Sequence, residues 1–242
     1  MSSWKASGIL TDMLDIARVK AISIDLDDTL WPIWPTIEKA EKALHQWLQE
    51  FAPMTAALFS NPSALREIRD HMSSTRPDLK SDLSALRRES IRLALYRAGE
   101  SPLLAEQAFE VFFAERQRVT LFDDALPALE FLSVRFPLVS VSNGNSDLEK
   151  VGVGAFFRAG ISAREFGVGK PDPRIFHAAA GAVDLLPEDL LHVGDDATLD
   201  GLGALNAGMQ AAWVNRSDNL WPHELQPHVT LANLTELCAL FK

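Results

Sequence analysis

Residues 21–29 constrain the fold more than any other part of the chain. Their apolar run, residues 21–26, has the composition of a strand that is buried on both faces of a parallel sheet. Acidic residues begin within this run and continue past its end, and open α/β sheets bind ligands at the carboxyl ends of their strands. The sequence therefore predicts an α/β fold with a polar site at the end of its first strand.

The second half of the chain alternates strand-like and helix-like segments. The strand-like runs are residues 137–142, 190–193 and 210–214, and the helical patterns are residues 125–136, 174–186 and 199–207. Such alternation is typical of a Rossmann-like, doubly wound parallel sheet.

The first half does not alternate, because its periodic segments from residue 36 to about residue 119 all look helical. One apolar stripe at helical spacing consists of Ile37, Ala40, Leu44, Leu48 and Phe51. A second helix is expected over residues 83–98, closed by Gly99, and a third is expected to begin at Ser101-Pro102.

These patterns define the predicted domains. A Rossmann-like core of residues 1–30 and 120–242 is interrupted by an all-helical domain of residues 31–119. The insertion follows directly after the first acidic segment, so it should lie next to any site formed there.

The composition limits the partners of the chain. Its 242 residues carry a formal net charge of −10, and no stretch is rich enough in Lys and Arg to neutralise a nucleic-acid backbone. We therefore expect no nucleic-acid partner. An acidic chain that handles an anionic substrate needs local positive charge, which a metal ion and one lysine would supply.

The single cysteine, Cys238, excludes an internal disulfide, and its apolar neighbours predict that it packs in a core. Polar residues are scattered through the first twenty positions. No window reaches the roughly 18 unbroken apolar residues of a membrane span. We expect no membrane association and a cytoplasmic location.

The first chemical motif is Asp25-Leu26-Asp27-Asp28-Thr29. Two carboxylates two residues apart can take different roles, because the turn after the strand redirects the second side chain. Asp25 would attack phosphorus as a nucleophile, and Asp27 would act as general acid and then as general base. We expect the Thr29 hydroxyl to bond within the turn. Alone, the motif is equally compatible with an ordinary acidic turn.

The second motif, Ser142-Asn143-Gly144, ends a strand-like run. A hydroxyl and backbone N–H groups at a strand end can hold phosphate oxygens, and Gly144 lets the backbone approach closely. All three residues are candidates for phosphate binding. The same three residue types also form ordinary turns.

The third motif places Lys170 between Gly169 and Pro171. A lysine fixed by neighbouring prolines could bridge a nucleophile and a phosphate and reduce their repulsion. A P-loop is excluded, because Lys170 is followed by proline rather than by Ser or Thr and the glycine spacing differs. Without the other motifs, a solvated surface lysine would be the better interpretation.

The fourth motif, Gly194-Asp195-Asp196, follows another strand-like run, with Asp200 one helical turn later. Hard oxygen ligands at a strand end suit Mg²⁺. Asp195 is the predicted metal ligand, whereas Asp196 and Asp200 could orient metal-bound waters or cap the next helix. His192, which lies inside the strand, is predicted to be a core histidine with satisfied hydrogen bonds.

In their order along the chain, the four motifs resemble those of the haloacid dehalogenase superfamily, over residues 19 to about 214. The resemblance implies that Asp25 is the nucleophile and Asp27 the acid/base. It also implies that Ser142 and Lys170 contact phosphate, and that Asp25, the Asp27 carbonyl and Asp195 hold Mg²⁺. Dehalogenating members lack the second aspartate of the first motif, so Asp27 favours phosphate chemistry. The inserted helices resemble the family's cap, which closes over small substrates.

Three framework segments, residues 142–145, 191–196 and 207–213, also look like a bacterial clade of riboflavin-pathway phosphatases, which act on FMN and on phosphorylated ribitylaminouracil. The cap, which should set substrate choice, is much less similar. The resemblance therefore implies a magnesium-dependent phosphatase of a small phosphorylated metabolite, with these two compounds as candidate substrates.

Aromatic and cationic residues near the cap are candidates for substrate contact. Trp31 and Trp34 follow the catalytic turn and could stack on a flat ring, although packing at the hinge fits them at least as well. Arg87 and Arg88 could reach a substrate from a cap helix. Adjacent helical residues point about 100° apart, so at most one should face inward, and a surface position is favoured for each.

Other function classes fit parts of the pattern. Phosphoacceptor receiver domains also combine clustered Asp, a Ser or Thr, a Lys and Mg²⁺, but the motif order and the helical insertion argue against one. A phosphomutase, or a binding protein without turnover, could retain the same fold, and phosphate release would distinguish either from a phosphatase. The sequence leaves the oligomeric state open.

Overall fold

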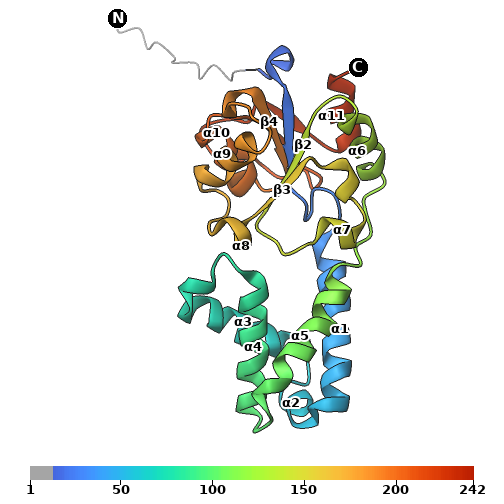
Figure 1. Ribbon diagram of the computed structural model, residues 1–242, viewed down its shortest axis with the longest axis vertical. Helices are drawn as coiled ribbons and strands as arrows, with labels where there is room; N and C mark the ends of the chain where they lie inside the picture. Colours follow the sequence, from blue (N-terminus) through green and yellow to red (C-terminus); the bar gives the residue numbers. More distant parts are fainter. Residues whose placement is uncertain (1–12) are drawn as a thin grey trace, which may run out of the picture.

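The computed structural model describes residues 13–242, in which strands form a single parallel sheet (Figure 1). Their spatial order is β3-β2-β1-β4-β5-β6. The strands are β1 (Ala21–Ile24), β2 (Leu138–Ser142), β3 (Ala159–Ser162), β4 (Leu190–Gly194), β5 (Gln210–Val214) and β6 (Val229–Leu231).

The first strand of the chain lies at the centre of the sheet. Ile22 of β1 is in register with Leu138 of β2 on one side and with Leu191 of β4 on the other. The chain therefore builds the sheet outward from β1 in both directions, as a doubly wound fold does, and the predicted fold class is confirmed. The carboxyl ends of β1, β2 and β4 meet at one edge.

Helices cover both faces of the sheet (Figure 1). Helices α6 (Ala125–Ser133) and α11 (Leu234–Leu240) pack on the face that carries Ile22 and Ile24. Helices α9 (Pro173–Gly181) and α10 (Gly203–Asn206) pack on the opposite face, against Val139 and Val141. Because neighbouring strand residues point to opposite faces, both faces of these strands are apolar and buried.

Between β1 and α6 the chain forms a separate helical region, which we call the cap. It consists of α1 (Ile33–Phe51), α2 (Pro53–Leu58), α3 (Pro62–Thr75), α4 (Leu83–Arg97) and α5 (Ala105–Arg116). Leu44 and Leu48 of α1 pack with Leu95 of α4 and Phe109 of α5 in a core of their own. In Figure 1 the cap lies beyond the edge where the strands end.

Short elements complete the described part of the chain. The α-helical ones are α7 (Leu148–Val151) and α8 (Ala163–Phe166), and η6 (Ala197–Leu202) is a π-helix that leads into α10. The 3₁₀ turns are η1 (Ile16–Arg18), η2 (Pro77–Leu79), η3 (Pro102–Leu104), η4 (Gly154–Phe156) and η5 (Pro187–Asp189).

The structure corrects several boundaries predicted from the sequence. The helix expected over residues 199–207 is split between η6 and α10, and those expected over 125–136 and 174–186 end at Ser133 and Gly181. Phe51 is 51% exposed at the end of α1, because the cap core stops at Leu48 and Ala52.

Two further predictions of local structure are confirmed, and one is wrong. Gly99 does close α4, with φ of 75°. Ser101 precedes the 3₁₀ turn η3 and makes no side-chain capping bond, so it does not cap an α-helix. Cys238 is buried among apolar neighbours, as predicted. In residues 13–242, none of the helices combines the length and the apolar character that crossing a bilayer requires.

Candidate active site

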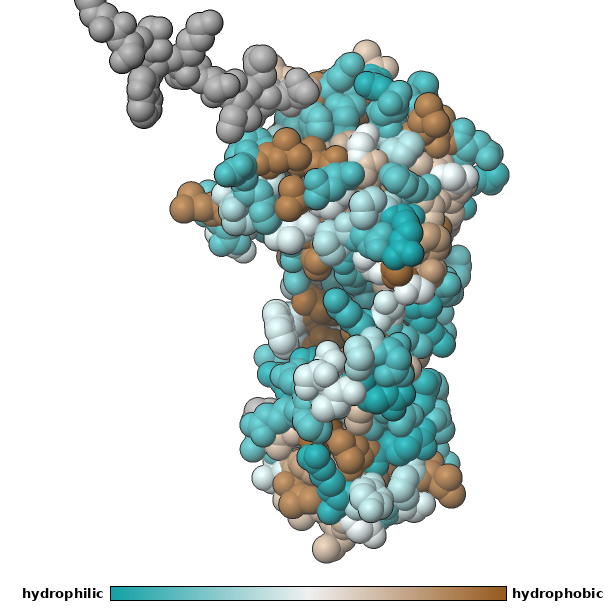
Figure 2. Space-filling model, turned by 90° about the vertical axis from the view of Figure 1, so that its left-hand side faces the viewer, coloured by the Kyte–Doolittle hydropathy of each residue, from teal (hydrophilic) through white to brown (hydrophobic). Residues whose placement is uncertain are grey.

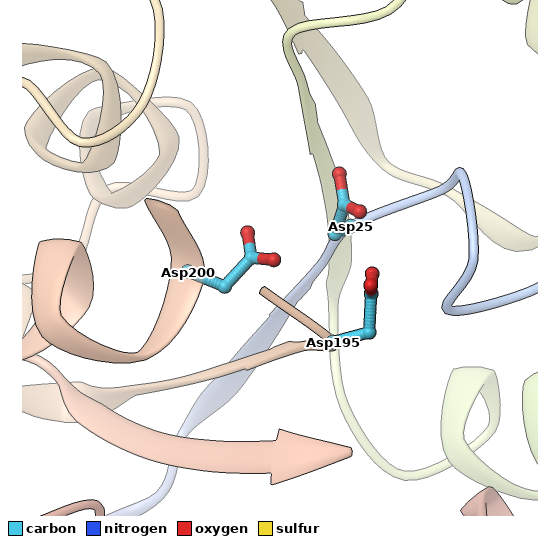
Figure 3. Close-up of side chains that lie close together, drawn as sticks. All are labelled: Asp25, Asp195 and Asp200. Carbon is cyan, nitrogen blue, oxygen red and sulfur yellow. The ribbon is translucent and has the colours of Figure 1, made fainter. Parts of the chain in front are cut away.

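Three carboxylates converge at the carboxyl edge of the sheet (Figure 3). Asp25 follows β1, Asp195 follows β4, and Asp200 belongs to η6. One ligand atom from each lies within 4.8 Å of one from each of the others. The parallel topology explains this convergence, because β1 and β4 are neighbours in register and end together.

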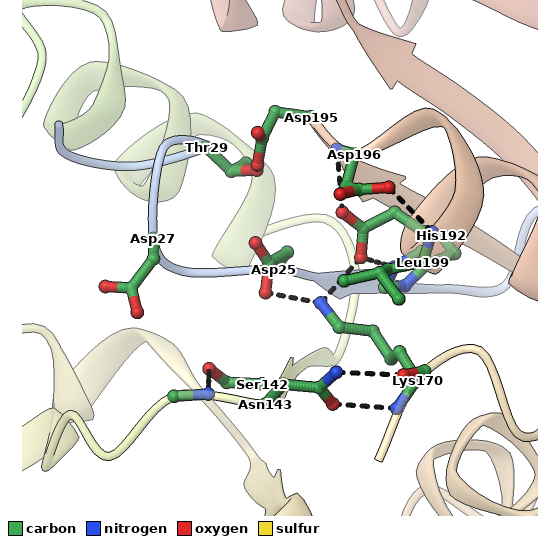
Figure 4. A network of polar contacts seen from close by, with 12 residues as sticks. Asp25, Asp27, Thr29, Ser142, Asn143, Lys170, His192, Asp195, Asp196 and Leu199 are labelled. Atoms are coloured by element: carbon green, nitrogen blue, oxygen red, sulfur yellow. Dashed lines mark hydrogen bonds and ion pairs between the residues drawn. The ribbon is translucent and has the colours of Figure 1, made fainter. Parts of the chain in front are cut away.

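Lys170 reaches the same cluster from the loop between α8 and α9 (Figure 4). Its buried Nζ donates to Asp25 Oδ1 and, at 2.6 Å, to Asp200 Oδ1. Burial lowers the pKa of Lys170, but the charges of Asp200 and Asp25 outweigh this effect and raise the pKa above its usual value. The side chain is therefore a buried cation rather than the surface lysine that was the alternative interpretation.

Asn143 holds the backbone of Lys170. Its Nδ2 donates to the Lys170 carbonyl at 2.9 Å, and its Oδ1 accepts from the Lys170 N–H at 2.7 Å. Both ends of the Asn143 side-chain amide are therefore used by Lys170, so any contact of Asn143 with phosphate would come from its backbone N–H, and that contact stays a prediction. Asp172, two residues after Lys170, caps α9 by accepting from Arg174 N at 3.0 Å.

The structure separates the roles of Asp196 and Asp200, which the sequence could not. Asp196 caps η6, because its Oδ1 accepts from the N–H groups of Thr198 and Leu199, both at 2.8 Å. Asp200 instead bonds to Lys170, to His192 Nε2 at 3.1 Å and to Asp196 N at 3.0 Å. Burial raises the pKa of Asp200, but the charge of Lys170 and the His192 bond lower it to about 2.

His192 is a core histidine, as predicted. It is buried, its Nδ1 shares a hydrogen bond of 2.8 Å with Ser23 Oγ, and its ring packs edge-on against Phe176. Burial lowers the pKa of His192, which favours the neutral ring.

The cluster has more negative charge than Lys170 alone can offset. Burial, followed by the charge of Asp200, raises the pKa of Asp195 to about 7, and burial raises that of Asp25 well above its usual value. Both oxygens of Asp200 already accept protein donors, so Asp25 and Asp195 have the freer oxygens. Buried carboxylate oxygens that lack a cationic partner are the ligands that Mg²⁺ prefers, so these residues fit a divalent cation.

Thr29 bonds across the site rather than within its own turn. Its Oγ1 donates to Asp195 Oδ1 at 3.0 Å, which corrects the expectation from the sequence. The hydroxyl orients one oxygen of Asp195 and leaves the other available.

Asp27 lies apart from Asp25, with its carboxylate turned away (Figure 4). Arg116 Nη2 donates to both of its oxygens at 2.7 Å, and Trp31 Nε1 donates to Oδ1 at 2.8 Å. Arg116, the last residue of α5, is 2% exposed, and its Nη1 has no hydrogen-bond partner among residues 13–242 as far as they are described. Nothing in the sequence distinguishes Arg116, because it lies 89 positions from Asp27 in a helix with an ordinary charge pattern.

Trp31 has no exposed surface on which a substrate ring could stack. It is 0% exposed and packs in the core under β1, with its indole N–H committed to Asp27. The hinge-packing alternative for Trp31 is therefore the right one, and the expected ring stacking by this residue is wrong.

Ser142 and Gly144 lie beside Asp27. Ser142 Oγ accepts from the Gly144 N–H at 2.9 Å. A Cβ atom on Gly144 would lie 2.5 Å from Asp27 Oδ2, so the missing side chain provides room for the carboxylate.

A cavity of about 400 Å³ lies between the cap and the strand ends. Figure 2 shows a notch at the level where the two regions meet, with hydrophobic side chains inside it. The core contributes Asp27, Gly144 and Asn145 to the cavity. The cap contributes Ile33, Trp34, Ile37, Arg69, Asp70, Ser73, Leu83, Leu86, Arg87, Phe112 and Arg116.

Three of the residues considered for substrate contact lie in the cap. Trp34 lines the cavity and is 56% exposed, so it stays a candidate for substrate contact. Arg87 also lines the cavity but is buried, which corrects the surface position expected for it. Arg88 pairs with Glu106 at 2.8 Å. As predicted, at most one of the two adjacent arginines faces inward.

Comparison with known proteins identifies the family. Residues 19–208 match the family model of the haloacid dehalogenase-like hydrolases. The chain belongs to this family. The superfamily resemblance seen in the four motifs is thus confirmed.

Several relatives in the haloacid dehalogenase-like family are named phosphatases. The chain is 30% identical to 5-amino-6-(5-phospho-D-ribitylamino)uracil phosphatase YigB of Escherichia coli, over 93% of this chain and 97% of the relative. It is 34% identical to a phosphoserine phosphatase of Thermus thermophilus, over 62% of this chain and 63% of that protein. These similarities make the chain a haloacid dehalogenase-like phosphatase.

Solved structures agree with the fold. A 2-haloacid dehalogenase of Pseudomonas syringae superimposes with a TM-score of 0.85 at 36% identity, over 92% of this chain and 98% of that one. An L-2-haloacid dehalogenase of Xanthobacter autotrophicus superimposes with a TM-score of 0.63 at 21% identity. The second likeness bears on the fold alone.

Proposed function

We propose that this phosphatase is a Mg²⁺-dependent phosphomonoesterase that acts on a small phosphorylated metabolite through a phospho-aspartyl intermediate on Asp25. The observation that carries the proposal is the pairing of Asp25 with the buried ammonium of Lys170, next to Asp195. A carboxylate held by a lysine at a strand end can meet an incoming phosphate without a second uncompensated negative charge.

The first step forms the intermediate. A carboxylate oxygen of Asp25 bonds to phosphorus while the bond between phosphorus and the ester oxygen breaks. Lys170 balances charge on Asp25 and on the phosphoryl oxygens. Ser142 Oγ and the Gly144 N–H, which bond to each other at 2.9 Å, would bind those oxygens when the phosphoryl group is present. Mg²⁺ held by Asp25 and Asp195, and in this family by the Asp27 carbonyl, would neutralise phosphoryl charge when bound.

Asp27 moves the protons in the proposed mechanism. As an acid, it gives a proton to the departing alkoxide. As a base, it then takes a proton from a water molecule, whose oxygen attacks phosphorus and releases the Asp25 carboxylate and inorganic phosphate. Asp27 must turn toward the reacting atoms for these transfers, and its bonds to Arg116 and Trp31 define the position from which it turns.

For the substrate, we propose phosphorylated ribitylaminouracil or FMN, each of which joins a planar ring to a phosphate through a ribityl chain. The similarity to the Escherichia coli enzyme supports this choice, because it extends over almost the whole of both chains. The cavity between cap and core also supports it, since Trp34 and Phe112 give it an aromatic lining. We also propose that residues 31–119 act as the cap domain and that residues 1–30 and 120–242 act as the catalytic core.

The experiment that tests the proposal measures inorganic phosphate release with and without Mg²⁺. The panel contains phosphorylated ribitylaminouracil, FMN, sugar phosphates and nucleotides, with Asp25→Asn as the blank. We expect metal-dependent release that is fastest on the two ring-bearing ribityl phosphates and absent from the blank. Release that persists in the blank would contradict the mechanism, and release confined to other substrates would contradict the substrate choice.

A further inference from the structure

Arg87 is a buried cation without a hydrogen bond in the described part of the chain. It lies on α4, is 5% exposed and lines the cavity between cap and core. Its nearest acidic partner is Glu41, with Arg87 Nη2 and Glu41 Oε1 3.7 Å apart. That distance allows an ion pair but exceeds that of a hydrogen bond.

Glu41 is already occupied by another arginine. Arg66 Nε donates to both oxygens of Glu41 at 3.1 and 3.0 Å, and Arg66 Nη2 donates to Oε2 at 2.5 Å. Glu41 therefore offsets the charge of Arg87 without satisfying its N–H groups. Burial lowers the pKa of Arg87 to about 10, which leaves the guanidinium charged at neutral pH.

The guanidinium of Arg87 packs on Phe112, and no acceptor among the described residues uses its N–H groups. Because Arg87 also lines the cavity, a ligand that brings oxygen atoms there could accept from these donors. The position of Arg87 therefore indicates a binding role.

The surroundings of Arg87 indicate what kind of group it binds. The guanidinium lies over the Phe112 ring, with Cζ 4.3 Å from the ring centroid, and Trp34 lines the same cavity. Asp70 also lines it, with a largely exposed carboxylate that is paired with Arg69 at 2.8 Å. Because Arg69 offsets the charge of Asp70 and Glu41 offsets that of Arg87, a neutral ring with both carbonyl and N–H groups would suit Arg87 and Asp70 together.

We propose, building on the proposed function, that Arg87 is the specificity-determining residue of the cap and binds carbonyl oxygens of a planar, neutral ring in the leaving group of the substrate. The ring lies against the aromatic lining, Asp70 accepts from its N–H groups, and the phosphate end reaches Asp25 past Asp27 and Gly144. Phosphate esters without such a ring reach the same catalytic residues but leave Arg87 unpaired.

Arg87→Met tests the proposal, because methionine keeps much of the volume and removes the donors. Arg88→Met on the same helix is the matched control, since Arg88 pairs with Glu106 at 2.8 Å. We expect Arg87→Met to lower kcat/KM for phosphorylated ribitylaminouracil and FMN by about 10- to 100-fold, the effect of losing hydrogen bonds to a charged donor. Turnover of ribitol 5-phosphate, which has no ring, should stay within about twofold of the wild type.

A binding measurement separates this inference from the proposed function. Calorimetry measures the binding of riboflavin to the Asp25→Asn variant. Riboflavin has the ring and the ribityl chain but no phosphate. Binding that is lost on adding Arg87→Met but kept on adding Arg88→Met supports the inference, even if FMN is not hydrolysed. Failure of riboflavin to bind, or equal losses of kcat/KM on ring-bearing and ring-free substrates, would overturn it while leaving the phosphatase mechanism intact.

Folding of each variant is checked by its unfolding temperature. If Arg87→Met does not fold, Arg87→Lys keeps the charge but loses the fork of donors, and the same selective loss on ring-bearing substrates is expected. An unchanged ranking of substrates in Arg87→Lys would overturn the inference.

Discussion

The core and the cap treat their buried charges differently. At the strand ends of the core, Lys170 bonds Asp25 and Asp200, and His192 completes the network by bonding Asp200. In the cap, Arg87 borders the cavity without a hydrogen bond to any described residue, and Trp34, which lines the same cavity, is half exposed.

This difference suggests a division of labour. A network of buried groups that bond to one another is held rigidly, which suits the phosphoryl group that all substrates share. A cavity wall with unused donors gains from a ligand that supplies acceptors, which suits the part of the substrate that varies. We therefore expect core variants to lose activity on every substrate, and cap variants to change the ranking of substrates.

Asp25→Asn should have the largest effect. Removing the nucleophile is expected to reduce kcat by about 10⁴-fold or more on every substrate. Phosphate release measures the loss. The unfolding temperature in the presence of Mg²⁺ should also change, because the substitution removes one proposed metal ligand. Near-normal turnover of even one phosphate ester by this variant would break the division between the two regions.

Lys170→Met should come next. We expect a fall in kcat of about 10²- to 10³-fold on all substrates. Because Asp25 and Asp200 lose their shared cation, the free energy of unfolding should also fall by about 3–5 kcal/mol, as for a broken buried ion pair. Urea unfolding and phosphate release measure the two effects. A loss restricted to ring-bearing substrates would mean that Lys170 affects substrate choice, as the cap residues are expected to do. That result would contradict the division between core and cap.

Arg116→Met tests the contact that joins the two regions, since Arg116 ends a cap helix and bonds the core residue Asp27. If Arg116 positions Asp27 for proton transfer, kcat/KM should fall about 10²-fold on alkyl phosphates, whose leaving groups need a proton. The fall in kcat/KM should be several times smaller on p-nitrophenyl phosphate, because its leaving group departs without needing a proton.

The leaving-group dependence of kcat/KM is the decisive readout for Arg116. A merely structural role would lower activity equally on alkyl and aryl esters. Trp31→Phe, which removes only one donor to Asp27, should show the same pattern with a smaller loss.

Trp34→Ala should have the smallest effect and the most selective one. Loss of an aromatic contact is expected to weaken turnover of FMN by about 2- to 10-fold, with little change on a generic phosphate ester. Steady-state kinetics on both substrates measure the difference. Equal losses on the two would contradict ring stacking by Trp34 and would assign it to packing between cap and core.

The sequence predicted the core site well because its residues follow strands. Asp25, Ser142 and Asp195 come at the ends of β1, β2 and β4, and parallel strands bring those ends together whatever their separation in the chain. The short strand β3, with Gly160 in it, and the three-residue strand β6 were missed, because neither has a long apolar run.

The sequence predicted the cap contacts poorly, because helical periodicity does not say which residue of a helix meets the core. Arg116 and Arg87 lie in helices with ordinary charge patterns, and only the packed structure shows that they are buried at the cavity. Trp31 is a residue type that can stack on a ring, but it packs in the core. In the core, the sequence did not indicate that the Asn143 amide pairs with the backbone of Lys170.

The close approach at Gly144 has a consequence for the tolerance of this chain to mutation. A single methyl group there would lie 2.5 Å from a carboxylate oxygen of Asp27, well inside the contact distance of the two atoms. Even alanine, the mildest replacement, must displace the proposed proton donor. In a saturation mutagenesis screen scored by growth or turnover, position 144 should therefore be as intolerant as position 25, although its residue has no side chain to react.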